Sequence, residues 1–394
     1  MTDLAFRAEP GAETHHHLLG DHSILGRWWR SGDKLSLLAV AVLIMVGLLI
    51  SFAASVPYAE KRGLPPFHFV SRHIVFSVLT FVLIVALSTM SAERTRRNGV
   101  RLFLVAALAV ALLPVFGTDF GKGAVRWYSF GLSVQPSEFL KPGFAVLTGW
   151  MMAAQLRPWG PPGVMMSFGI LTAVLVGLAI QPDFGQALLV VAAWGAMFFT
   201  WGAPIALVVG LGGAGVGIVW FAYSNFEYIR SRIDDYWAAE IDPTSQIGYA
   251  TAAIQKGGLF GVGAGEGSVK WSLPDAHTDF VMAVAAEEYG LAFCVVVILL
   301  YLFITLRAVT RLTRERDAFI RVAGAGLAAF FGAQAFINIG VTFTLLPAKG
   351  MTLPFVSYGG SSMIASGIGV GFLLALTRDR PQNHVTDRLG RGGA

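Results

Sequence analysis

Long apolar runs separated by short polar segments dominate this chain. A helix rises 1.5 Å per residue, so about 20 apolar residues cross the ~30 Å hydrocarbon core of a bilayer. Ten runs of this kind occur, and none alternates apolar and polar residues as the strands of an outer-membrane barrel do. The pattern therefore predicts an all-α polytopic membrane protein with ten transmembrane helices. The predicted spans are 35–54, 69–90, 100–117, 136–156, 164–181, 184–201, 203–223, 277–306, 320–345 and 356–377.

Composition and charge support this class. Of the 394 residues, 55% are hydrophobic and 13% are charged, whereas soluble proteins carry about 25% charged residues. The single cysteine, Cys294, excludes an intrachain disulfide. The net charge of +5 does not indicate a nucleic-acid partner, because the basic excess gathers on one side of the predicted spans, as in the positive-inside pattern.

Arginine clusters set the predicted orientation. They follow the second and eighth spans and therefore face the cytoplasm. An even number of spans places both chain ends on that side. We accordingly expect cytoplasmic tails at 1–34 and 378–394, a membrane domain at 35–377, and a large periplasmic loop at 223–276 between the seventh and eighth helices. The clusters contain Arg94, Arg96, Arg97, Arg101, Arg307, Arg311, Arg314, Arg316 and Arg321.

The 223–276 loop contains two features of its own. Asp242 followed by Pro243 predicts the start of an amphipathic helix on the membrane surface, ending before Gly257. The glycine-rich stretch 257–274 lacks the register of a dinucleotide fingerprint or a phosphate loop. Two interpretations remain for it: a tightly folded backbone near a polar ligand, or a flexible re-entrant loop.

Ionisable residues at the start of span eight form the first candidate site. His277, Thr278 and Asp279 lie at the entrance of this span, and carboxylates at membrane depth normally face the bundle interior or a watery cavity. Asp279 is either a site carboxylate or a carboxylate stabilised by the helix N-terminus. We expect this cluster to open toward the outer side of the membrane.

A second group lies before and within span four. Arg126 precedes the span, and Glu138 and Lys141 stand three residues apart within it. The last two could simply pair with each other. Alternatively, Lys141 could pair with Asp279 across a cavity and keep that carboxylate ionised. Arg72 lies at the same predicted depth.

A third group precedes the last span. Prolines, glycines and hydroxyl residues in 346–362 predict a rigid polar turn, and non-helical backbone at this depth is tolerated only inside protein or beside water. Gln334 and Asn338 of span nine could satisfy its backbone groups. Its candidate binding residues are Lys349, Ser357 and Tyr358.

These segments together resemble a known family. The runs GAVRWYSFGLSVQPSEFLK, QPDFGQA, AAIQKGGLFGVGAGEGSVKWSLPDAHTDFVMAVAAEEYG and LLPAKGMTLPFVSYGGSS are similar to the SEDS family of bacterial peptidoglycan glycosyltransferases, over roughly residues 35 to 377. The turn at 349–354 resembles the cell-division branch of that family. Gln181 departs from the family pattern, which more often has a glutamate there.

The resemblance implies an inner-membrane enzyme that polymerises lipid II at the outer leaflet during septation. It also implies a class B penicillin-binding protein, the septal transpeptidase, and other divisome proteins as partners. The family's essential aspartate falls on Asp279 and its lysine on Lys141. On this basis we expect Asp279 to act as general base. Lys141, Arg72, Arg126 or a bound divalent cation could stabilise the leaving pyrophosphate, although no metal-ligand spacing is present. The further substrate-binding candidates are Glu138, His277, Thr278, Lys349, Ser357 and Tyr358.

Two other function classes stay open at this point. A flippase would move lipid-linked precursors between leaflets and needs alternating access with a midplane coupling site. A non-catalytic scaffold would only recruit a transpeptidase. The position of the polar cluster near the outer interface favours the enzyme.

Overall fold

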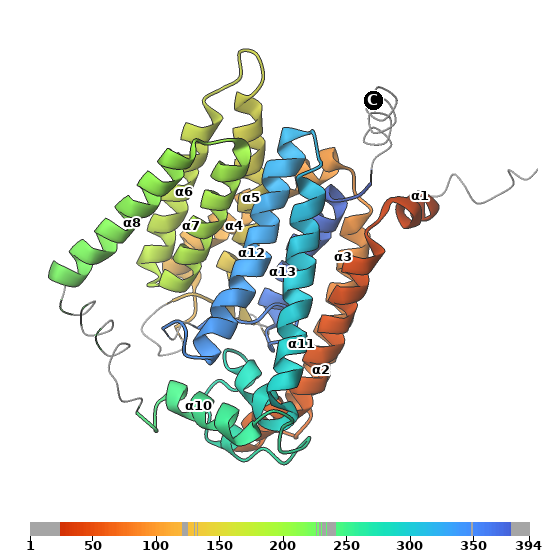
Figure 1. Ribbon diagram of the computed structural model, residues 1–394, viewed down its shortest axis with the longest axis vertical. Helices are drawn as coiled ribbons and strands as arrows, with labels where there is room; N and C mark the ends of the chain where they lie inside the picture. The colour runs from red at the N-terminus through yellow and green to blue at the C-terminus, as the bar shows by residue number, and fades with distance from the viewer. Residues whose placement is uncertain are drawn as a thin grey trace, which may run out of the picture.

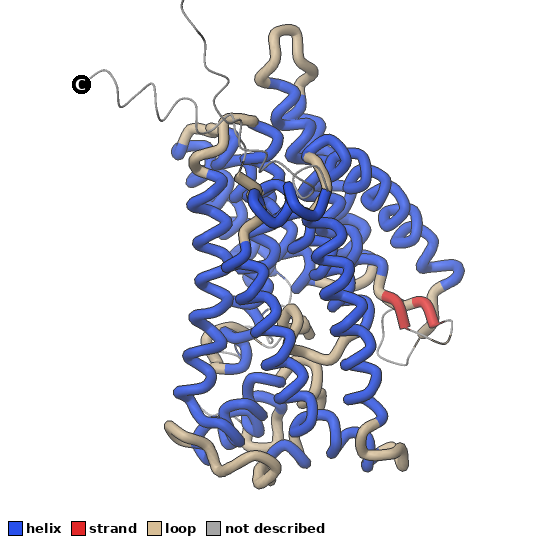
Figure 2. Tube along the Cα trace, turned by 90° about the vertical axis from the view of Figure 1, so that its right-hand side faces the viewer, coloured by secondary structure: helices blue, strands red, loops and turns tan. Residues whose placement is uncertain are grey.

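The computed structural model describes residues 24–119, 125–129, 131, 133–225, 227, 230, 234, 242–347 and 350–379 (Figure 1). Helices make up most of this part and run roughly alongside one another (Figure 2). The helices are α1 (Ile24–Ser31), α2 (Lys34–Lys61), α3 (His68–Ser88), α4 (Ala92–Phe116), α5 (Pro136–Gln155), α6 (Gly163–Ile180), α7 (Phe184–Trp201), α8 (Ile205–Asn225), α10 (Gln246–Gly257), η1 (Val269–Trp271), α11 (Val281–Leu312), α12 (Ala318–Thr342) and α13 (Gly360–Leu376). A two-stranded hairpin, β1 (Tyr128–Ser129) and β2 (Ser133–Val134), pairs antiparallel between α4 and α5.

Seven of the described helices are long and apolar enough to cross a membrane: α2, α3, α4, α6, α7, α11 and α12. The prediction of an all-α polytopic membrane protein is therefore confirmed. Helices α5, α8 and α13 occupy the other three predicted ranges. Helix α13 has 17 residues and α5 carries a buried ion pair, so the crossing of ten helices stays a prediction.

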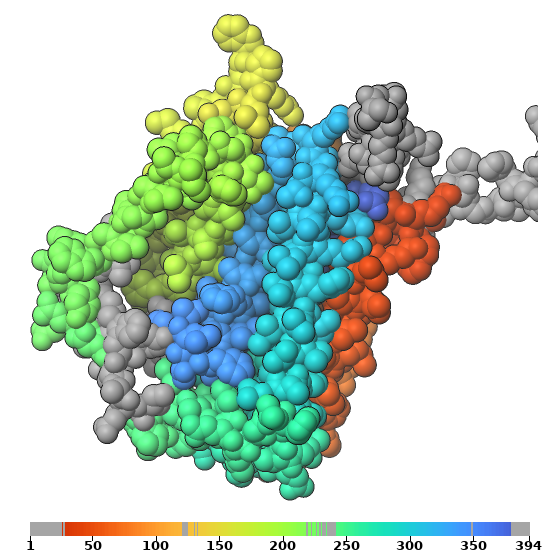
Figure 3. Space-filling model, in the orientation of Figure 1, coloured from red at the N-terminus to blue at the C-terminus, as the bar shows by residue number. Residues whose placement is uncertain are grey.

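Helix α12 lies at the centre of the packing, against α5, α7, α11 and α13. Small residues allow these close approaches. A Cβ on Gly149 of α5 would come 2.7 Å from the Cα of Ala323 on α12, and one on Gly326 would come 2.5 Å from the sulfur of Met197 on α7. On the space-filling surface, α12 (blue) is flanked by α11 (cyan), while α8 (green) stands at the edge of the molecule (Figure 3).

Both ends of the described chain meet at one end of the bundle. The N–H of Asp379 donates to the carbonyl of Ser31 at 2.9 Å. Asp33 forms ion pairs with Arg307 at 2.8 Å and Arg311 at 3.1 Å. Burial alone would raise the pKa of Asp33, but these arginines and hydrogen bonds from Ser36 hold it below its usual value. The shared end agrees with an even number of spans, and α10 lies at the opposite end (Figure 1).

Several element boundaries differ from the sequence prediction, since α2 ends seven residues later, at Lys61, and α4 begins eight residues earlier, at Ala92. Three further differences concern the predicted periplasmic loop and the candidate site. Ser245, not Asp242, is the N-cap of α10: its hydroxyl accepts the Gly248 N–H at 3.0 Å, while Asp242 accepts the Thr244 N–H at 2.8 Å and forms a preceding turn. Helix α11 begins at Val281 and α13 at Gly360, each four residues later than predicted. In both cases the preceding residues form turns that build the candidate site. The predicted tails lie largely outside the described residues.

Candidate active site

Asp279 occupies a compact turn immediately before α11. Its N–H donates to the carbonyl of Asp275 at 3.0 Å, and its own carbonyl accepts from Asn338 Nδ2 at 2.8 Å. A Cβ on Gly350 would lie 3.2 Å from Asp279 Oδ2, so the half-buried carboxylate faces the segment that precedes α13. The N-cap of α11 is Phe280. Capping of α11 therefore does not explain the position of this carboxylate.

Two amides on α12 hold the segment before α13. Asn338 Nδ2 donates to the carbonyl of Met351 at 2.6 Å, in addition to that of Asp279. Gln334 Nε2 donates to the carbonyl of Thr352 at 2.9 Å. The prediction that these two side chains satisfy the polar turn is confirmed, and the same amides bring this turn next to Asp279.

Lys141 forms a buried network with its own helix and with α12. Its ammonium donates to Glu138 Oε2 at 2.8 Å and to Gln334 Oε1 at 2.7 Å. Gln186 of α7 donates to the other oxygen of Glu138 at 2.6 Å. Such extra hydrogen bonds offset the desolvation of a buried ion pair. Of the two alternatives for Lys141, the structure has the pair with Glu138, and its connection to the Asp279 turn runs through α12.

A small cavity of about 30 Å³ lies beside this ion pair, between α5, α12 and α13. Glu138, Lys141 and Gln334 contribute its polar wall, and side chains such as Phe330 and Phe331 its apolar wall. A space of this size is enough for about one or two water molecules, beside the Lys141–Glu138 pair and Gln334.

Arg126 fixes the turn between α6 and α7. Its Nε donates to the carbonyl of Gln181 at 2.8 Å and its Nη2 to that of Pro182 at 2.9 Å. Asp183 in the same turn caps α7 by accepting the Gln186 N–H at 3.3 Å. Burial raises the pKa of Asp183, and the charge of Arg126 opposes this rise. The guanidinium of Arg126 thus already has a local structural role.

The turn around His277 is held by aromatic rings. The imidazole stacks on Tyr58 of α2 with ring centroids 4.0 Å apart, and its carbonyl accepts the Tyr358 N–H at 2.9 Å. Burial raises the pKa of Tyr358, while a hydrogen bond and the charge of exposed Arg72 oppose the rise. Arg72, His277 and Tyr358 therefore gather on the α2–α3 side of Asp279. The sequence contained no signal for Tyr58, which is one aromatic residue among many.

Hydroxyl groups tie the remaining candidates together. Ser357 Oγ donates to the carbonyl of Thr278 and accepts the Leu353 N–H at 2.8 Å. Thr278 Oγ1 donates to the carbonyl of Asp275 at 3.2 Å. Lys349, the remaining predicted binding residue, lies outside the described residues. Within the described ranges, no three His, Cys, Asp or Glu side chains gather to hold a metal ion, and we derive no step through a cation.

Comparisons with known proteins place this chain in a family. The model of the cell cycle protein family of FtsW, RodA and SpoVE matches residues 33–382. The chain belongs to this family. It is 42% identical to the probable peptidoglycan glycosyltransferase FtsW of Caulobacter vibrioides, over 93% of this chain and 95% of the relative. It is 36% identical to the corresponding protein of Halorhodospira halophila, over 88% of this chain and 90% of the relative.

Solved structures of the FtsW/RodA/SpoVE family share the fold. A chain from a peptidoglycan synthase complex, studied for the structural coordination of polymerization and crosslinking, matches with a TM-score of 0.74 at 28% identity. It covers 90% of this chain and 100% of that one. The rod shape determining protein RodA of Thermus thermophilus matches with a TM-score of 0.65 at 26% identity, covering 90% of this chain and 99% of RodA. As a family member, this chain is a multi-pass inner-membrane glycosyltransferase of cell-wall synthesis.

Proposed function

We propose that this enzyme polymerises lipid II into glycan strands at the outer leaflet during septation, with Asp279 as general base. The observation that carries the proposal is the position of the Asp279 carboxylate. It faces the segment before α13 while its backbone is held by Asn338 and Asp275. A general base needs this combination of an accessible carboxylate and a fixed backbone.

The proposed step forms one glycosidic bond and breaks one bond to phosphate. The 4-hydroxyl oxygen of the acceptor GlcNAc attacks C1 of the donor MurNAc, and its proton passes to Asp279. The bonding electron pair leaves with undecaprenyl pyrophosphate on the opposite face. Charge on the leaving group then requires a cationic partner.

Arg72 is best suited to that partner role. Its exposed guanidinium lies beside Tyr358, whose backbone is bonded to His277, two residues from Asp279. Arg126 already donates to two carbonyl groups, and the charge of Lys141 is neutralised by Glu138. We therefore assign Arg72 to pyrophosphate stabilisation and Lys141 to the positioning of α12.

A class B penicillin-binding protein, the septal transpeptidase, is the proposed partner, within a larger set of divisome proteins. Helix α11 exposes an apolar stripe suited to a single transmembrane helix. Helix α12 is mostly buried, with Phe336 64% exposed. The stripe on α11 consists of Val295, Leu299, Leu302, Leu306 and Val309.

The decisive experiment is polymerisation of labelled lipid II by the purified protein in detergent, with and without the transpeptidase. Glycan products lost in the Asp279→Asn variant would support the enzyme. A flippase would yield no glycan strands here, because detergent offers no second leaflet. A scaffold would leave lipid II unchanged under every condition, and either result would contradict the proposal.

A further inference from the structure

Two consecutive carboxylates, Glu287 and Glu288, lie two turns inside α11. Their exposed fractions are 0% and 1%. Buried charges at this depth are costly unless they are paired and hydrogen-bonded. The proposed reaction does not use either group, so their partners define what they do.

Glu287 caps the short helix η1. One carboxylate oxygen accepts the N–H groups of Ser268 at 2.7 Å and Val269 at 2.9 Å, and the other accepts that of Lys270 at 3.1 Å. Lys256 Nζ lies 3.3 Å from the first oxygen. A carboxylate at a helix N-terminus satisfies donors that lack partners within the helix. Glu287 thereby fixes the start of η1 to the inside of α11.

Glu288 fixes the preceding loop by a buried ion pair. One of its oxygens pairs with Lys270 Nζ, and the other accepts the Gly265 N–H at 3.0 Å. Lys270 is itself 6% exposed and also donates to the carbonyl of Gly265 at 3.2 Å. The part of the glycine-rich stretch from 265 to 270 is thus a tightly folded backbone held by hydrogen bonds to α11. Its polar partners are the protein's own carboxylates.

A break in α11 allows further hydrogen bonds between this helix and the glycine-rich stretch. Gly290 has φ of 84°, and the carbonyls of Glu287 and Glu288 accept from Val262 at 2.9 Å and Gly263 at 3.1 Å. On the other side of the break, the Leu291 N–H donates to the carbonyl of Gly258 at 3.0 Å. The loop therefore replaces the helical hydrogen bonds that the break removes.

These contacts close a circuit that contains Asp279. The chain runs from Lys270 through residues 273–280, which include Asp279. It then enters the first part of α11, residues 281–288, in which every residue is buried. The end of that piece holds η1, where the circuit began. Asp279 therefore lies between two points that are rigidly joined to each other.

We propose that Glu287 and Glu288 are positioning residues for Asp279, acting through η1 and the 273–280 segment without touching substrate. The inference rests on the proposed role of Asp279 as general base. A misplacement of about 1 Å can cost about 10²-fold in rate, so small relaxations of this circuit are expected to reduce turnover. Binding of lipid II, which involves other surfaces, is expected to persist.

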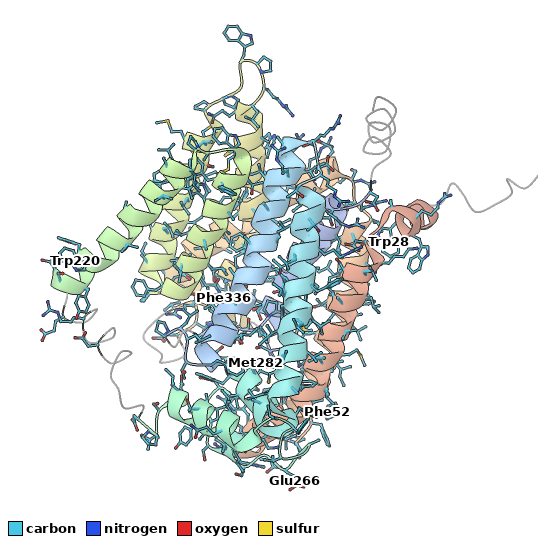
Figure 4. The ribbon with its side chains drawn as sticks, viewed as in Figure 1. Trp28, Phe52, Trp220, Glu266, Met282 and Phe336 are labelled. Atoms are coloured by element: carbon cyan, nitrogen blue, oxygen red, sulfur yellow. The ribbon has the colours of Figure 1, made fainter. Side chains whose placement is uncertain are left out.

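The first test breaks the ion pair from each side. In Glu288→Gln and Lys270→Met, kcat for lipid II polymerisation should fall about 10- to 100-fold at unchanged KM. The double variant should be no worse than either single variant, because residues in one network are non-additive. Glu266→Gln is the matched control: this exposed carboxylate lies in the same loop, at the lower end of the molecule in Figure 4, and the kcat of this variant should be unchanged.

The second test keeps every charge. A methyl group on Gly267 would lie 2.9 Å from Glu287 Oε2, so Gly267→Ala displaces the carboxylate without removing it. This variant should also lose kcat at unchanged KM, and hydrogen exchange within 273–280 should become faster. This variant tests the positioning role of Glu287 even if Glu288→Gln fails to fold.

Asp279→Asn is measured in parallel to separate the two proposals. Full activity of folded Asp279→Asn would overturn the general-base proposal, whatever the circuit variants do. Inactive Asp279→Asn together with wild-type kcat in folded Gly267→Ala and Lys270→Met would overturn the positioning proposal alone. A rise in KM at constant kcat would overturn it as well, since it would place the circuit in substrate binding.

Discussion

Gln334 and Asn338 lie one helical turn apart on α12, and each joins one proposed catalytic-site residue to the segment before α13. Gln334 accepts from Lys141 and donates to Thr352, while Asn338 donates to both Asp279 and Met351. Residues four apart share a helix face. One face of α12 therefore sets the position of the α5 ion pair relative to the Asp279 turn.

Replacing Asn338 by Leu should leave the carbonyls of Asp279 and Met351 without their donor. An unsatisfied buried polar group costs about 1–3 kcal/mol, so we expect a lower melting temperature in detergent and reduced polymerisation. Phe336→Leu, on the exposed side of the same helix (Figure 4), is the control. Unchanged stability of Asn338→Leu would contradict the assigned hydrogen bonds.

Asp279→Asn should reduce lipid II polymerisation by about 10² or more, the usual contribution of general-base catalysis, with folding and partner binding intact. Asp275→Asn is the control, because Asp275 has φ of 52° and asparagine tolerates this conformation well. Its activity should fall less. Near-normal synthesis by folded Asp279→Asn would contradict the general-base proposal.

Removing one partner of the Lys141–Glu138 pair should destabilise the protein strongly. Their side chains are 6% and 4% exposed, and an uncompensated buried charge costs about 3–5 kcal/mol. Thermal unfolding of Lys141→Met and Glu138→Gln should show this loss, and the double variant should recover most of it. If the double variant recovers both stability and activity, Lys141 has the proposed role of positioning α12. If it recovers stability but not activity, Lys141 takes part in the reaction itself.

Acid should weaken the ion pairs that Asp33 forms with Arg307 and Arg311 near the two chain ends. The folded pKa of Asp33 lies below its usual value, so its contribution to stability is complete above the pKa of the unfolded carboxyl. As the pH falls through that pKa toward the lower folded pKa, this stability is lost. Melting curves across this range should show a smaller acid effect in Asp33→Asn than in the wild type. An equal change of melting temperature with pH in both proteins would contradict the stabilising role of the Asp33 ion pairs.

Thiol labelling should report the orientation of the chain. Cys294 is 1% exposed and should resist impermeant reagents. Cysteines at Ser224 and Ser268, both exposed, should react from the periplasm in intact cells lacking an outer-membrane barrier. Labelling only after the inner membrane is opened would reverse the predicted topology.

The sequence predicted the helix ranges and the polar role of Gln334 and Asn338, because isolated amides in an apolar span need nearby partners. It left the partner of Lys141 undecided, since spacing on one helix cannot exclude a contact from another. The stack of His277 on Tyr58 was not predictable, because it joins residues 219 positions apart that only the tertiary packing of α2 brings together.

The packing of the glycine-rich stretch could not be predicted from the sequence either. Its composition indicated backbone freedom, but its packing against α11 depends on the break at Gly290. Hydrophobic periodicity does not reveal this break, because helix-forming sequence continues on both sides of it. Asp242 illustrates a local ambiguity of the same kind. Both Asp242 and Ser245 are good N-cap residues, and the turn formed by Thr244 decides between them.

The break in α11 also settles how far this helix can reach through a bilayer. Thirty-two residues of unbroken helix would measure about 48 Å, far more than the ~30 Å of hydrocarbon. The part from Leu291 to Leu312 alone measures about 33 Å, close to a full crossing. The earlier part is therefore not needed to span the bilayer, and the proposed role of Asp279 as general base would place its carboxylate at the level of the headgroups, where water can carry the proton away.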